Sequence, residues 1–315
     1  MGFEQPTFSH EPPKSYATLP TKDIKISHVP ESAPEATATI VVTLNRPQKY
    51  NAFTGTMGFE LVQSFTYFRY DDRVKCIILT GAGNKAFCAG MDLGMGFPTG
   101  EEERENEHRD LGGQVSLAIN NCRKPTIAAL NGSAVGVGIT MVLPCTIRLA
   151  TANTKIGFVF SRRGIVMEAV SSFFLPRLIG FSRALHITAT GETYAPDHHL
   201  LGPLFSEVLP SAEKTFERAL ALADDISKNT SSVAIGLMRD MMYRNPGSPE
   251  ETHLLDSRLL FGMFGRGDNL EGVKSFLEKR NPQFTASFFN NDDIPVAYPW
   301  WTPVDASPLK VKSKM

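Results

Sequence analysis

Apolar and polar positions alternate with two different periods along the first two thirds of the chain. Thr39–Leu44 alternates with period two, and residues 74–80 form a continuous apolar run; both patterns are typical of strands. Thr54 can cap a helix that follows. One face of this helix carries the apolar residues Met57, Leu61, Phe65 and Phe68. Because strands and helices alternate up to about residue 210, we predict an α/β core with βαβ crossovers over residues 37–210.

The final third of the chain has a purely helical pattern. We predict helices over residues 211–284, beginning near Ser211, Ser231, Ser248 and Asn269. Residues 285–315 contain several prolines and are expected to form an irregular tail. Residues 1–36 are also rich in proline and lack apolar periodicity, so we expect a loose arm with one strand at residues 24–29.

Residues 124–144 combine features that point to ligand chemistry. Thr126–Leu130 is a short buried strand, an Asn-Gly pair ends it, and Ser133 is placed to cap an apolar helix with two glycines in its first turns. A strand, tight turn and helix start direct free backbone N–H groups and the positive end of a helix dipole toward a ligand. We therefore expect an oxygen with negative or developing negative charge to bind here.

Composition narrows the range of partners. The chain has 315 residues, 42% of them hydrophobic, and a net charge of −1. Such a chain can bury a large core, and its charge gives no reason to expect nucleic acid. No apolar run approaches the roughly 18–20 residues of a membrane span. The four cysteines show no CxxC or short His/Cys spacing, so we expect buried thiols and no metal site.

The last three residues, Ser313-Lys314-Met315, nearly match the Ser-Lys-Leu peroxisomal address. We therefore predict location in the peroxisome through its import receptor, with the cytoplasm as the alternative.

Four segments resemble the crotonase (enoyl-CoA hydratase/isomerase) superfamily in order and spacing. They are residues 45–52, 87–93, 124–138 and 271–280, and the resemblance extends from about residue 37 to 284. It implies a spiral of ββα turns in residues 37–210 and a helical trimerisation region in residues 211–284. It also implies an acyl-CoA thioester substrate and a homotrimer or hexamer. Coenzyme A then belongs to the substrate, and no separate cofactor is expected.

The resemblance also assigns binding residues. The backbone N–H groups of Met91 and Val137 would hold the thioester oxygen, although many family members have glycine at the place of Val137. The late-helix residues Phe276 and Lys279 would lie near coenzyme A, in the same or an adjacent subunit. The other expected contacts to coenzyme A are Gln48, Ala52, Ala89, Gly90, Asp92, Leu93 and Gly136.

One departure from the family pattern changes the predicted chemistry. Hydratases of this family use two glutamates, and those positions hold Thr140 and Phe160 here. Glu168 instead stands where the Δ3,Δ2-enoyl-CoA isomerases have a glutamate. One carboxylate is enough to move a proton from C2 to C4, whereas adding water favours a second group. Burial among apolar neighbours would raise the pKa of Glu168 toward neutrality, as a general base requires.

We therefore predict an enoyl-CoA isomerase of fatty-acid or secondary-metabolite metabolism, with Glu168 as the base. Two alternatives stay open at this point. The protein is a hydratase for a branched or specialised acyl-CoA, helped by the acidic segment at residues 101–107, or it binds acyl-CoA without turnover. A separate alternative for Glu168 is that it merely lies at a helix N-terminus, where acidic side chains are favoured electrostatically.

Overall fold

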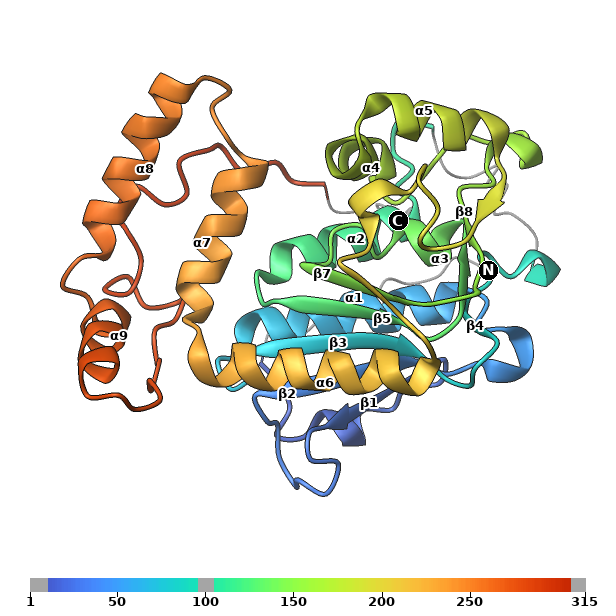
Figure 1. Cartoon of the computed structure of the whole chain (residues 1–315). Coiled ribbons are helices and arrows are strands. Elements are labelled where there is room, and N and C mark those ends of the chain that lie inside the picture. Colours follow the sequence, from blue (N-terminus) through green and yellow to red (C-terminus); the bar gives the residue numbers. More distant parts are fainter. Residues whose placement is uncertain (1–10, 96–104, 307–315) are drawn as a thin grey trace, which may run out of the picture.

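The computed structural model describes residues 11–95 and 105–306 (Figure 1). Its central sheet has six strands in the order β1-β2-β3-β5-β7-β10. β1 pairs antiparallel with β2, and the other neighbours pair parallel. The strands are β1 Ile24–His28, β2 Thr39–Leu44, β3 Cys76–Gly81, β5 Thr126–Leu130, β7 Ile147–Thr151 and β10 Glu207–Leu209.

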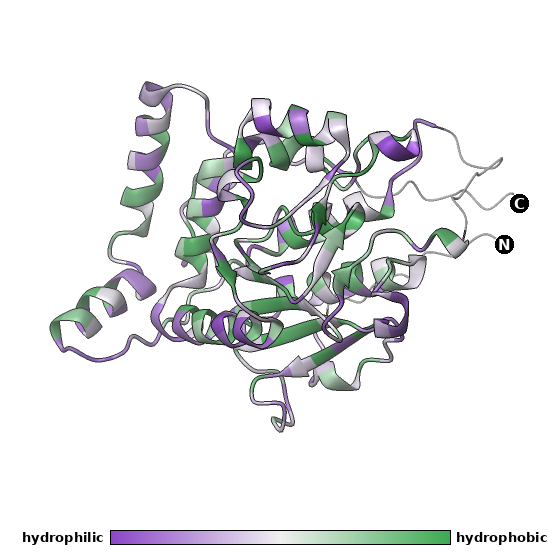
Figure 2. Cartoon of the chain, turned by 45° about the vertical axis from the view of Figure 1, so that its right-hand side comes forward, coloured by the Kyte–Doolittle hydropathy of each residue, from purple (hydrophilic) through white to green (hydrophobic). Residues whose placement is uncertain are grey.

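Helices cover both faces of this sheet, which explains why its strands are continuously apolar. In β3, Ile77 and Leu79 pack into the cluster that contains α1 (Gly55–Tyr70) and α2 (Leu111–Cys122). The alternating neighbour Ile78 packs against α6 (Ala212–Asn229) on the other face. Figure 2 shows the same strands as mainly hydrophobic ribbons. The predicted α/β core is confirmed.

A second, smaller sheet accompanies the central one. Its order is β4-β6-β8-β9. The strands are β4 Ala86–Cys88, β6 Ser133–Val135, β8 Ile156–Gly157 and β9 Thr193–Tyr194. The one-turn helix α3 (Val137–Thr140) follows β6 directly. The helices α4 (Ser171–Ile179) and α5 (Phe181–Thr190) come after β8 in the chain.

Three C-terminal helices extend to one side of the core (Figure 1). They are α7 Ser232–Tyr243, α8 Pro249–Met263 and α9 Gly267–Leu277. The expected caps Ser211, Ser231 and Ser248 each accept a backbone N–H of the first helical turn. Large apolar side chains on α8 and α9 are exposed, as at Phe261 and Phe276. The prediction that this region mediates trimer formation stays a prediction.

Two local expectations were wrong. Ser133 does not cap a helix: it lies in β6, and its hydroxyl accepts the N–H of Lys155. The helix begins three residues later, with Gly136 as its N-cap, because the chain first pairs with β4 and β8.

Part of the N-terminal arm that was expected to be loose is packed on the core. Tyr16 is buried, and its hydroxyl donates to Asp71 over 2.8 Å. The predicted strand appears as β1.

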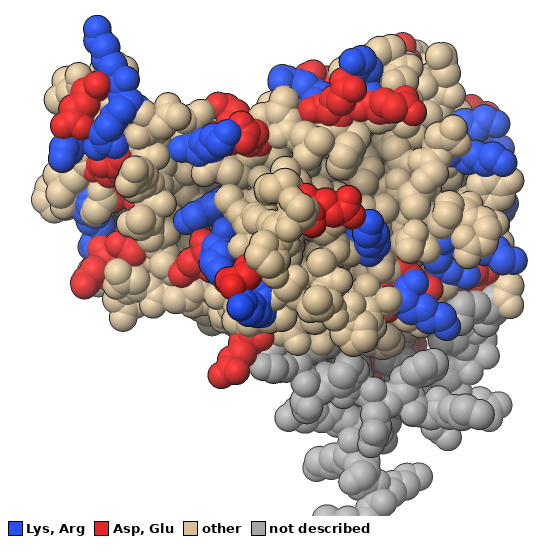
Figure 3. Space-filling model, turned by 90° about the horizontal axis from the view of Figure 1, so that it is seen from below, with Lys and Arg blue, Asp and Glu red and all other residues tan. Residues whose placement is uncertain are grey.

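Surface charge and helix length add two observations. Positive and negative side chains intermix on the face drawn in Figure 3. Within residues 11–95 and 105–306, no helix has the length and apolar character needed to cross a bilayer.

Candidate active site

The register of the small sheet brings two turns together. β4 and β6 run parallel, with Cys88 opposite Ala134. Met91 and Val137 each follow three residues after this pair. Since parallel strands end at the same edge of a sheet, both turns lie at that edge. The turns are close: a Cβ atom on Gly136 would lie 3.9 Å from the Cα atom of Gly90.

Both turns leave an amide hydrogen available. The Gly90 carbonyl accepts the Phe53 N–H over 2.8 Å, and the Asp92 N–H donates to the Phe53 carbonyl, which leaves the Met91 N–H between them. Val137 is the first residue of α3, where an N–H has no partner within the helix. No acceptor in the described part of the chain takes either N–H. Two converging amides of this kind can bind a developing oxyanion.

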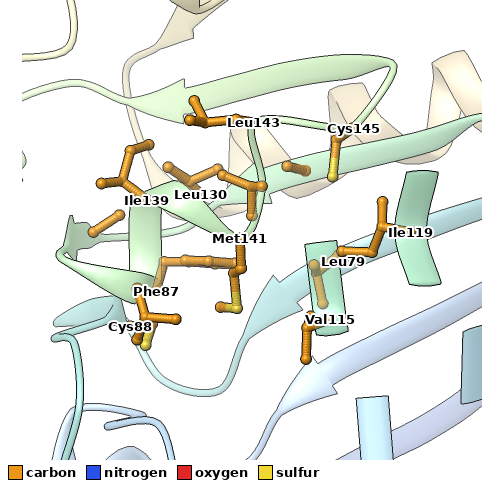
Figure 4. Close-up of a cluster of buried hydrophobic side chains, with 14 of the residues drawn as sticks. Leu79, Phe87, Cys88, Val115, Ile119, Leu130, Ile139, Met141, Leu143 and Cys145 are labelled. Atoms are coloured by element: carbon orange, nitrogen blue, oxygen red, sulfur yellow. The ribbon is translucent and has the colours of Figure 1, made fainter. Parts of the chain in front are cut away.

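Glycines allow the two turns to form. Gly90 and Gly136 have φ angles of 102° and 56°, in the region that favours glycine. Gly138 packs directly on β4, because a Cβ atom there would lie 2.3 Å from the Cys88 carbonyl oxygen. Beneath this contact lies an apolar cluster that includes Phe87, Cys88 and Ile139 (Figure 4). The two turns that carry the amides therefore pack on a buried apolar cluster.

Glu168 reaches the same place from a different segment. It precedes two residues in the left-handed region, Ala169 (φ 56°) and Val170 (φ 57°), after which α4 begins. Its Oε1 accepts the Thr140 hydroxyl over 2.5 Å, at the end of α3. Its Oε2 lies against α2, since a Cβ atom on Gly112 would be 2.1 Å away. The carboxylate is thus enclosed by α2, α3 and its own turn.

The surroundings of Glu168 change its acidity. Its pKa is raised to about 7: burial is the largest cause, the Thr140 hydrogen bond opposes the shift, and the nearby Asp110 carboxylate adds to it. The expectation that burial would raise this pKa is confirmed. A carboxylate with a pKa near 7 can both accept and return a proton at neutral pH.

Comparisons with known proteins now place the chain. The sequence profile of the family described as "Enoyl-CoA hydratase/isomerase" matches residues 35–287. The chain belongs to this family. It is 52% identical over 251 residues to "Enoyl-CoA hydratase AFT3-1" of Alternaria alternata, covering 80% of this chain and 84% of that protein. It is 32% identical over 257 residues to "1,2-epoxyphenylacetyl-CoA isomerase" of Escherichia coli (strain K12), covering 78% of this chain and 94% of that protein.

A solved structure agrees with this membership. DspI of Pseudomonas aeruginosa superposes with a TM-score of 0.74 at 28% identity, covering 86% of this chain and 100% of that one. The expected crotonase fold is therefore confirmed, and the protein is an enzyme of the enoyl-CoA hydratase/isomerase family that processes acyl-CoA.

The structure brings most of the predicted coenzyme A contacts of this family together. The Ala89 N–H donates to the Tyr50 carbonyl, which joins the loop that carries Gln48 and Ala52 to the turn that carries Gly90 and Leu93. Gln48, Ala89 and Leu93 are exposed there. These residues lie around the two amides, and their contact with coenzyme A stays a prediction.

Asp92 has a structural role in this arrangement. Arg46 donates to its carboxylate over 2.9 Å and to the Ala52 carbonyl over 2.7 Å. The hydrogen bond from Arg46 holds the pKa of Asp92 below its ordinary value. Arg46 therefore fixes the turn after β4 to the loop after β2.

Phe276 and Lys279 lie apart from the site. Phe276 is exposed on α9, Lys279 follows that helix, and α9 is at the opposite end of the molecule from α3 (Figure 1). Within one chain the structure does not bring them to the amides. They can contact coenzyme A only from an adjacent subunit, which stays a prediction.

Three contributors were missed from the sequence: Arg46, which joins two loops, Gly112, which lies beside the Glu168 carboxylate, and Asp110, which accepts the N–H of Ala169 after Glu168. The N-cap pattern of Asp110 before an apolar helix was a usable signal, because its side chain accepts the Gly113 N–H over 2.5 Å. Arg46 and Gly112 act through contacts across 46 and 56 residues of sequence, which no local pattern contains.

Gly112→Ala tests whether the carboxylate position matters. The new methyl group would overlap Oε2 of Glu168. It would also lie 3.2 Å from Cγ2 of Val137 and 3.3 Å from Cβ of Ala169, so it has no room to shift and the carboxylate must move instead. We expect turnover to fall roughly 10²-fold, since displacing a reacting group by about 1 Å has this effect. The free energy of unfolding should change by less than about 1 kcal/mol, because alanine favours helix.

Gly55→Ala is the matched control for this variant. Gly55 begins α1, and nothing lies within 4 Å of the position of its Cβ atom. Steady-state kinetics and urea unfolding should separate the two variants. Wild-type turnover in Gly112→Ala would show that the carboxylate lies elsewhere during the reaction.

Proposed function

We propose that this enzyme is an enoyl-CoA isomerase that moves a proton between C2 and C4 of an unsaturated acyl-CoA thioester. The observation that carries the proposal is the place of Glu168: its carboxylate lies close to Val137, whereas the carboxylate of the neighbouring Asp110 accepts two backbone N–H groups. Thr140 and Phe160, both buried, occupy the two places where the family resemblance puts the glutamates of hydratases. Among the residues that the structure describes, Glu168 is the group that we assign to accept a proton beside the two amides.

The geometry supports a simple sequence of steps. The Met91 and Val137 N–H groups bind the thioester oxygen of a β,γ-unsaturated substrate. Ionised Glu168 takes a proton from C2, and the electron pair moves onto that oxygen to give an enolate. Protonated Glu168 then delivers a proton to C4, either the one taken from C2 or one exchanged with solvent, which forms the C2–C3 double bond and restores the carboxylate. Thr140 holds Oε1 throughout, so that Oε2 is the atom that exchanges the proton.

Hydration of an enoyl-CoA is the second candidate. It is favoured by the 52% identity to a protein named as an enoyl-CoA hydratase. A hydratase would need a further group to activate water. In the acidic segment, Glu105 is exposed, and residues 101–103 lie outside the described part of the chain. Binding of acyl-CoA without turnover is disfavoured by the enclosed Glu168 carboxylate close to Val137 and by membership in the enoyl-CoA hydratase/isomerase family.

A panel of enoyl-CoA thioesters in heavy water separates the candidates. An isomerase should move the double bond and incorporate deuterium at C2 and C4 with no gain of oxygen. A hydratase should yield a 3-hydroxyacyl product that carries labelled oxygen when the solvent is labelled. Mass spectrometry reports both. Hydration of every substrate without migration of a double bond would contradict the isomerase proposal.

We also propose the peroxisome as the site of action and the homotrimer or hexamer as the assembly. Ser313-Lys314-Met315 lies outside the described residues, and its sequence alone supports import. Deleting these three residues from a fluorescent fusion should move it to the cytoplasm. Unchanged location in the peroxisome would exclude the signal.

Replacing Thr140 with valine should shift the pH dependence of turnover upward. The Thr140 hydroxyl lowers the pKa of Glu168 by hydrogen bonding to its ionised form, so its removal makes the base ionise at higher pH. We expect the rising limb of kcat/KM, near pH 7 in the wild type, to move to higher pH in Thr140→Val. Thr140→Ser keeps a hydroxyl and should retain the wild-type limb. Identical limbs in both variants would mean that Thr140 does not contact the base.

A further inference from the structure

Asp110 connects the start of α2 to the turn that carries Glu168. Its Oδ2 accepts the Gly113 N–H over 2.5 Å and the Ala169 N–H over 3.1 Å. The first bond caps α2, a local role that many helices show. The second bond crosses 59 residues of sequence and ends on the residue directly after Glu168. One carboxylate oxygen therefore joins two of the segments that enclose the base.

The segment that Asp110 holds is strained. Ala169 and Val170 both have positive φ angles, although neither is glycine, and Val170 is branched at Cβ. Such residues are disfavoured in this region and persist only where neighbours enforce them. The Ser171 N–H and hydroxyl both donate to the Glu168 carbonyl on the other side of the turn. The Asp110 bond restrains the backbone of the turn from outside, while the Thr140 hydroxyl bonds the Glu168 side chain.

Asp110 also acts on the charge of Glu168. In the described residues, the titratable groups that interact with Glu168 are Asp110 and the buried thiol of Cys88. A second negative charge nearby disfavours ionisation of the base. Position and charge thus come from the same side chain.

We propose that Asp110 is a positioning residue that clamps the strained turn of Ala169 and keeps the Glu168 carboxylate against α2 in its reactive position. The inference rests on the proposed role of Glu168 as the base. Asp110 is assigned to act through the position and charge of Glu168, because its Oδ2 already accepts two backbone N–H groups.

Two substitutions separate charge from position. Asp110→Asn keeps an oxygen that can accept both N–H groups but removes the charge. We expect the rising limb of kcat/KM for C2 proton exchange to move down by roughly one pH unit, so that exchange at pH 6 becomes faster than in the wild type. Asp110→Ala removes the clamp as well. We expect kcat to fall roughly 10–100-fold at all pH values with little change in KM.

Asp268 provides a matched control. Asp268 lies in the first turn of α9, away from the site. Its Oδ1 accepts the N–H groups of Thr285 and Ala286 over 2.9 and 3.0 Å. Asp268→Asn should leave the pH limb in place. An unmoved limb in Asp110→Asn, or an Asp110→Ala enzyme that loses no more turnover than Asp268→Ala, overturns the assignment. If Asp110→Ala does not fold, the limb of Asp110→Asn decides.

A measurement without turnover keeps the two proposals distinct. The unfolding temperatures of the wild type and of Glu168→Gln are measured over a range of pH. The pH dependence of the difference between them reports the pKa of Glu168. This profile should move down in the Asp110→Asn background. If Glu168→Gln retained full exchange, the proposed function would fail, while a moved profile would still show that Asp110 acts on Glu168. An unmoved profile would overturn the role of Asp110 alone.

Discussion

Glu168→Gln is expected to reduce exchange of the C2 proton roughly 10³-fold while the protein stays folded. Glutamine has the same size and keeps an oxygen for the Thr140 hydroxyl, whose bond to Oε1 is 2.5 Å in the native protein. Its amide cannot accept a proton, so the enolate cannot form at a useful rate. Binding of acyl-CoA should persist, because the two amides and the loop after β2 are unchanged.

The same substitution should increase stability at neutral and high pH. The native pKa of Glu168 is about 7, above the ordinary 4.5, so between these values the folded state binds more protons than the unfolded state. The contribution of Glu168 to the free energy of unfolding therefore falls as pH rises from 4.5 to 7 and is constant above that. From this 2.5-unit difference, Glu168→Gln should be more stable than the wild type above pH 7 by about 3 kcal/mol.

Chemical unfolding at pH 4.5 and pH 8, with exchange measured by mass spectrometry, tests both expectations. Glu250→Gln changes an exposed glutamate in the first turn of α8 and should leave activity and stability unaltered. A Glu168→Gln enzyme with undiminished exchange would require another base. A variant less stable than the wild type at pH 8 would contradict the burial of an ionised carboxylate.

Local hydrogen bonding explains how much of the fold could be predicted. Thr54, Ser211, Ser231 and Ser248 each cap the helix that follows them, as expected, because a cap needs only residues within one turn. The continuous apolar run at residues 74–80 also predicted a strand, which is β3. The family resemblance, rather than periodicity, supplied the spiral arrangement and the two amides.

Contacts between distant segments explain what was missed. Ser133 has the side chain of a cap, yet pairing with β4 and β8 makes it part of a strand. The left-handed conformations of Ala169 and Val170 cannot be read from residues that normally avoid them. They follow from the packing of the turn on α2 and α3, and so does the position of the carboxylate.

Gly138→Ala should damage both the fold and the two amides. A Cβ atom at this position would lie 2.3 Å from the Cys88 carbonyl oxygen and 2.9 Å from the Cys88 Cβ, so backbone atoms have to move. We expect the free energy of unfolding to fall by roughly 2–3 kcal/mol, as for other overpacked sites. The added methyl group pushes α3 away from β4. Since Val137 directly precedes Gly138 and Met91 lies three residues after Cys88, the two N–H donors also move apart.

Loss of one oxyanion donor typically lowers kcat roughly 10²–10³-fold, and we expect Gly138→Ala to lose at least this much. Gly55→Ala, with open space at its Cβ position, should keep wild-type kcat and stability. Urea unfolding and steady-state kinetics at a temperature where both variants are folded measure the two effects separately. Folded Gly138→Ala with wild-type kcat would mean that the amides of Met91 and Val137 do not stabilise the enolate, because the contact that sets their separation would then be dispensable for the reaction.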